Sequence, residues 1–127
     1  MEELVSQVAL RAGLAPEVTG QAIAVIFAFL RKEGPAQEID SLFATISGAA
    51  EAAATKADAF GGGLFGGFMS KMGGGVMMLA GQLTSLGLGI NDMQSLGKAL
   101  FENLREKVGE EHLGRIAAAI PGLSQLL

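Results

Sequence analysis

The clearest pattern of apolar and polar residues lies in the first quarter of the chain and predicts a long helix. Apolar side chains recur there at steps of three and four residues, as one helix face requires: Val18, Ala22, Val25, Ile26 and Phe29. Pro16 suits the first turn of this helix, and Gly34 followed by Pro35 stops it. No charge occurs between Glu17 and Arg31, so we expect burial on most sides.

The same reasoning predicts further helices on both sides of a glycine-rich middle. Residues 38–59 are typical of one or two helices, with Gly48 as a break. In the second half, Asn91 or Asp92 is the expected cap of a helix that ends at Gly109. A short helix then runs over residues 110–120 and stops before Pro121-Gly122. The longer helix carries an apolar stripe: Met93, Leu96, Leu100, Leu104 and Val108.

The two halves align with each other without a gap. At a constant offset of 74, residues 12–49 lie over residues 86–123, and apolar positions keep the same phase. The offset also brings residues 76–86 over residues 2–12, the expected first helix of the first copy. The identical pairs are Gly13/Gly87, Leu14/Leu88, Phe27/Phe101, Leu30/Leu104, Arg31/Arg105, Ala44/Ala118, Ile46/Ile120 and Gly48/Gly122.

This alignment predicts an all-α protein with a single domain over residues 1–127. Repeat 1 covers residues 2–49, a connector covers residues 50–75, and repeat 2 covers residues 76–123. Neither copy buries its apolar face well alone, so we expect the two to pack with approximate two-fold symmetry into one bundle. Leu30 and Leu104 are then residues of a shared core.

The motifs that carry the repeat resemble those of small bacterial protein families of unknown function. They are Gly-Leu before an apolar helix, then "FLRKEGP" or "NLREKVG", then an Ile-Ser/Pro-Gly ending and the glycine-rich apolar middle. The chain is similar to the VcgC/VcgE-like group and, more distantly, to the YidB-like helical proteins. The resemblance implies an all-α fold and assigns no catalytic or binding residue.

The glycine-rich middle of the chain allows two interpretations. Residues 60–90 carry one charge and are long enough to span a membrane, but each of their many glycines costs a helix about 1 kcal/mol relative to alanine. Its apolar side chains either lie across the core between the repeats or form an adaptable surface for a partner helix or lipid. The candidate surface residues are Phe60, Leu64, Phe65, Phe68, Met69, Met72, Met77 and Met78.

Candidate chemistry is sparse. The chain has no cysteine and a single histidine, His112, which we expect to be a solvated residue in a first helical turn rather than a metal ligand or a catalytic base. Arg31 and Arg105, matched in both repeats, could form an anion site, but basic residues at helix C-termini are favoured by the helix dipole in any case. We expect no metal, no cofactor and no enzymatic activity.

The charge balance bears on the class of partner. Nine basic and thirteen acidic residues give a net charge of −4, which argues against nucleic acid as a partner. The N-terminal sequence starts acidic and carries Arg11 in its apolar stretch, unlike a secretory signal, so we expect a cytoplasmic protein. The hypothesis is a non-enzymatic interaction module that acts through self-association or a protein partner. The alternative is binding of peripheral lipid or a small apolar ligand at the Gly/Met/Phe-rich stretch.

Overall fold

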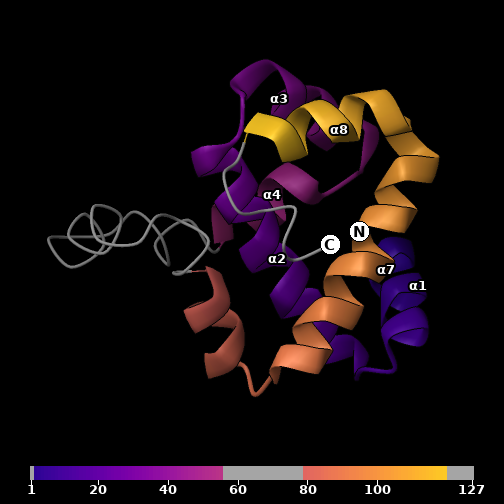
Figure 1. Ribbon diagram of the computed structural model, residues 1–127, viewed down its shortest axis with the longest axis vertical. Helices are drawn as coiled ribbons and strands as arrows, with labels where there is room; N and C mark the ends of the chain where they lie inside the picture. Colours follow the sequence, from indigo (N-terminus) through magenta and orange to yellow (C-terminus); the bar gives the residue numbers. More distant parts are fainter. Residues whose placement is uncertain (1, 56–78, 120–127) are drawn as a thin grey trace, which may run out of the picture.

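The computed structural model describes residues 2–55 and 79–119, and all regular secondary structure in these two ranges is α-helical (Figure 1). The all-α class predicted from the sequence is therefore confirmed. The helices are α1 (Glu2–Ala12), α2 (Pro16–Glu33), α3 (Ala36–Thr45), α4 (Ala49–Thr55), a helical segment at 79–85, α7 (Ile90–Val108) and α8 (Glu110–Ala119).

The described helices share one apolar core. Every residue from Ala22 to Leu30 is buried, so the middle of α2 is covered on all sides, as its lack of charge predicts. Leu30 and Leu104 are both fully buried members of the same cluster. Helix α1 packs against α7, and α4 packs along α2. Figure 1 shows α3 and α8 beside each other at one end of the bundle, where the two helices are in contact.

Two turns of the same kind lead into the long helices α2 and α7. Gly13 and Gly87 have positive φ angles of 71° and 93°, a backbone conformation that glycine adopts without steric cost. After each glycine, the next residue's N–H donates a hydrogen bond five residues back. Leu14 donates to the Ala9 carbonyl at 3.0 Å, and Leu88 donates to the Leu83 carbonyl at 3.3 Å. This bond satisfies a carbonyl at the end of the preceding helix.

The helix bounds recur at the spacing found in the sequence. Helices α2 and α7 begin 74 positions apart, at Pro16 and Ile90. Helices α3 (Ala36–Thr45) and α8 (Glu110–Ala119) are 74 positions apart at both ends. Residues separated by 74 positions are called counterparts below.

The helix ends refine two sequence predictions. Residues 38–59 were expected to hold one or two helices, and two are described, α3 and α4, with Gly48 in the turn between them at a φ of 86°. The expectation that Asn91 or Asp92 caps α7 is wrong, because the N-cap is Gly89. Asp92 lies in the first turn instead, where its carboxylate accepts a hydrogen bond from the Gly89 N–H at 3.2 Å.

In the described ranges, no single helix is long and apolar enough to cross a membrane. Helix α1 and residues 16–32 of α2 reach the required length and composition only as a pair, and that pair is bent by 111°.

Candidate functional site

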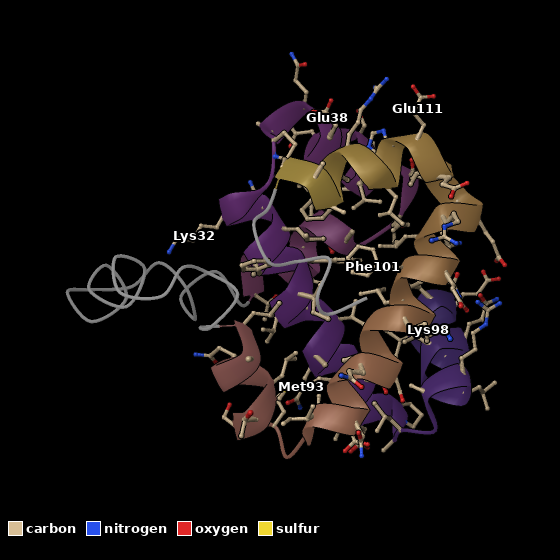
Figure 2. All side chains as sticks on the ribbon, in the orientation of Figure 1. Lys32, Glu38, Met93, Lys98, Phe101 and Glu111 are labelled. Carbon is tan, nitrogen blue, oxygen red and sulfur yellow. The ribbon has the colours of Figure 1, made fainter. Side chains whose placement is uncertain are left out.

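A groove of about 460 Å³ lies between α7 and α8. Each helix contributes one face to it, because the lining residues follow the spacing i, i+3, i+4 and i+7 in both. From α7 these are Lys98, Phe101, Glu102 and Arg105, and from α8 they are Glu110, Leu113, Gly114 and Ala117. Figure 2 labels Lys98 and Phe101 along α7.

The groove has an apolar floor and a charged rim. Phe101 and Leu113 are each only 4% exposed, so they form the floor together with the half-buried Ala117. The four charged lining residues are exposed at its edges and comprise two cations and two anions. A Cβ atom added at Gly114 would meet nothing within 4 Å, so this wall of the groove is open. Such a surface can accept apolar side chains from another segment while its edges stay hydrated.

Five of the eight counterpart positions on α2 and α3 are buried: Ala24, Phe27, Ala28, Ile39 and Phe43. Phe43, the counterpart of Ala117, packs its ring against Phe27, the counterpart of Phe101, with ring centroids 5.5 Å apart. Ala24 and Ala28 are buried, whereas their counterparts on α7, Lys98 and Glu102, are exposed.

Helix α4 is the second reason for this burial. It packs along α2 through a surface of small residues, in which Ala49 and Ala53 are fully buried. The small side chains of Ala49 and Ala53 allow the backbone of α4 to come close to α2. The counterparts of Ala49 and Ala53 lie beyond Ala119 and therefore outside the described residues.

His112 differs from its predicted environment. It was expected to be solvated, but it is half-buried, with Nε2 2.8 Å from the backbone carbonyl oxygen of Glu38 in α3. Because a carbonyl oxygen only accepts hydrogen bonds, the ring nitrogen is the donor. Packing of α8 against α3 brings the two together, and this contact between helices has no signal in the local sequence.

A buried polar contact joins α1 to α7. Asn103 is 1% exposed, and its side-chain N–H donates a hydrogen bond to Oε1 of Gln7 at 2.9 Å. The counterpart of Asn103 in α2 is Phe29, which is fully buried. The hydrogen bond satisfies the Asn103 amide where it is removed from water.

The surface residues proposed from the sequence lie outside the described ranges. These are Phe60, Leu64, Phe65, Phe68, Met69, Met72, Met77 and Met78, and the predicted connector beyond position 55 lies there with them. Of the two matched arginines, Arg105 lines the groove and Arg31 is exposed on α2.

Sequence reasoning missed the groove, although one signal for it is present in the repeat alignment. At three counterpart pairs, the residues of the two halves differ in size or charge: Phe43 and Ala117, Ala24 and Lys98, and Ala28 and Glu102. A comparison of the two copies for differences, rather than for identities, would have marked this face of α7 and α8 as distinct.

Across residues 2–55 and 79–119, no group of three or more histidine, aspartate or glutamate side chains is placed to hold a metal ion. In the comparisons with known proteins, no family model, no curated protein and no solved structure matches the chain.

Proposed function

We propose that this protein is a non-enzymatic interaction module that binds a second copy of itself or a protein partner through the groove between α7 and α8. The observation that carries the proposal is the contrast between this groove and the counterpart face of α2 and α3. That face is closed by Phe43 and α4, whereas the face of α7 and α8 leaves an apolar floor within reach of another chain.

The chemistry of the lining favours a protein segment as the partner. An apolar centre with a polar, solvent-accessible rim is the usual anatomy of a protein interface. Lys98 and Arg105 are balanced by Glu102 and Glu110, so the rim has no net charge with which to attract a polyanion.

We also propose that the module consists of two tandem helical units related by an approximate two-fold axis, with the first unit at residues 2–49 and the second at residues 76–123. The recurring helix bounds and the paired turns at Gly13 and Gly87 support this arrangement. Further support comes from the hydrogen bond between His112 and Glu38, which are 74 positions apart. In a two-fold arrangement, a residue can contact its own counterpart only near the axis.

The test is a variant that fills the groove without disturbing the helix. Gly114→Phe suits this purpose, because a side chain at this position starts in open space and glycine is a poor helix former. The matched control is Ala118→Phe, at an exposed position of α8 that does not line the groove.

Self-association is measured by sedimentation of the full chain over a range of concentrations, and partner binding is measured by recovery from cell lysate. We expect Gly114→Phe to abolish the interaction and Ala118→Phe to retain it. If the full chain is a monomer at every concentration and recovers no partner that depends on the groove, the proposed function is wrong.

A further inference from the structure

The charged rim of the groove between α7 and α8 is available to another molecule. The rim residues are all exposed: Lys98, Glu102 and Arg105 on α7, and Glu110 on α8. Across residues 2–55 and 79–119, the ion pairs join other residues: Arg11 with Glu106, and Arg115 with Glu111. The rim charges of both signs can therefore pair with charges of a second chain.

The order of charges along α7 is complementary to itself. Lys98 and Glu102 lie four positions apart on the same face of the helix, and the floor residue Phe101 lies between them. When two copies of such a helix run antiparallel about a two-fold axis at position 100, Lys98 of each copy lies opposite Glu102 of the other. The contact then contains the same ion pair twice, as expected for an interface between identical surfaces.

The apolar floor favours this register over a second one that the rim charges allow. An axis midway between Glu102 and Arg105 would also bring opposite charges together, but it lies further along α7 from Phe101 than position 100 does. Position 100 keeps the apolar floor at the centre of the contact and the charges around it. On α8, Gly114 leaves open space for the approaching helix, because an added Cβ atom there meets nothing within 4 Å.

The charge of the whole chain also favours contact at this place. Each copy carries a net charge of −4, so two copies repel each other on average. The rim is an exception, because its two cations and two anions balance. Two identical rims can therefore meet without an excess of negative charge between them, and their complementary pattern fixes the relative orientation of the copies.

We propose that the partner in the groove is a second copy of this chain, bound antiparallel about a two-fold axis near position 100 of α7. Lys98 of each copy pairs with Glu102 of the other, and the two floors at Phe101 face each other beside the axis. This inference rests on the proposed function and narrows its partner to the chain itself.

Charge reversal tests the proposal, because the two ion pairs are related by symmetry. Lys98→Glu places glutamate opposite glutamate at both pairs, and Glu102→Lys places lysine opposite lysine. In an equimolar mixture of these two variants, every glutamate of one copy faces a lysine of the other. The matched control is Lys107→Glu, which makes the same change of charge at an exposed position of α7 that does not line the groove.

We expect each of the two groove variants to self-associate at least about tenfold more weakly than the unaltered chain, because like charges then face each other. Their mixture should recover most of the lost affinity. Lys107→Glu should associate as the unaltered chain does. A mixture of Lys107→Glu with Glu102→Lys has the same net charges as the test mixture but keeps one repulsive pair, so it should recover less.

Sedimentation of the full chains at low salt measures these affinities, and circular dichroism verifies that each variant keeps its helices. Equal association of the test mixture and the control mixture would overturn the proposal. Groove variants that associate as tightly as the unaltered chain would also overturn it.

This experiment can fail independently of the proposed function. Self-association that Gly114→Phe abolishes and the charge variants leave unchanged would reject the pairing of Lys98 with Glu102 and retain the interaction module. A chain that stays monomeric but recovers a groove-dependent partner from lysate would reject the second copy and again retain the module. A monomer that recovers no such partner would reject both.

Discussion

Two faces of this molecule have similar helical frameworks but differ in what covers them. On α2 and α3, Ala24, Ala28 and the ring of Phe43 are buried, and α4 packs against both helices. On α7 and α8, the counterpart positions hold charged residues and Ala117, and a groove of about 460 Å³ remains. The comparison teaches that a few differences of side-chain size and charge separate a buried helix face from one that leaves an open groove, although the helices begin at corresponding positions.

The substitutions with the largest expected effect on stability test whether the two faces belong to one cooperatively folded structure. Leu30→Asp and Leu104→Asp each place an unpaired charge in the core, where both leucines are fully buried. We expect each substitution to cost at least about 4 kcal/mol of unfolding free energy and to lower the stability of the whole protein. Thermal and denaturant unfolding followed by circular dichroism should then show one transition for each variant.

Separate transitions, each lowered by only one of the two substitutions, would contradict a single shared core. The control is Ser95→Asp, because Ser95 is exposed on α7 and an added charge there stays hydrated.

An exchange of counterpart residues tests directly whether the face of α2 is buried and the face of α7 is exposed to solvent. Ala28 is 5% exposed, so Ala28→Glu has to bury a carboxylate or displace what covers α2, and we expect a cost of about 3 kcal/mol. The reciprocal change, Glu102→Ala, removes a charge from an exposed position and should alter stability by less than about 0.5 kcal/mol. Denaturant unfolding measures both values, and similar costs would show that the two faces are covered alike.

The smallest expected effect concerns the counterpart pair of Phe29 and Asn103, in which a buried amide replaces a buried aromatic ring. Gln7→Ala, Asn103→Ala and the double variant form a cycle around the hydrogen bond between α1 and α7. We expect each single change to cost about 1 kcal/mol, and the double change to cost less than their sum. Strict additivity in unfolding experiments would mean that the hydrogen bond contributes no coupling.

Helix positions could be predicted from the sequence because they depend on neighbouring residues. The apolar period and the stop at Gly34 define α2, and the break at Gly48 separates α3 from α4. The turn glycines at 13 and 87 allow positive φ angles that other residues avoid. Each of these signals acts within about one helical turn, so the residues that produce it are neighbours in the sequence.

The groove and the environment of His112 could not be predicted in the same way. Both depend on which helices meet: α8 against α7 for the groove and α8 against α3 for the histidine. The N-cap of α7 was missed for a more local reason, since Asp92 can serve a helix start either as the cap or from the first turn. Sequence spacing alone does not choose between these two geometries.

The contact between Gln7 and Asn103 also has a consequence for biosynthesis. These residues are 96 positions apart, and a ribosome that adds 5 to 20 residues per second needs roughly 5 to 20 seconds to make that length. During this time α1 has α2 to pack against but not α7, which is one of the two helices that it contacts in the folded protein. A nascent chain stalled before α7 would therefore present the α7-contacting face of α1 to chaperones.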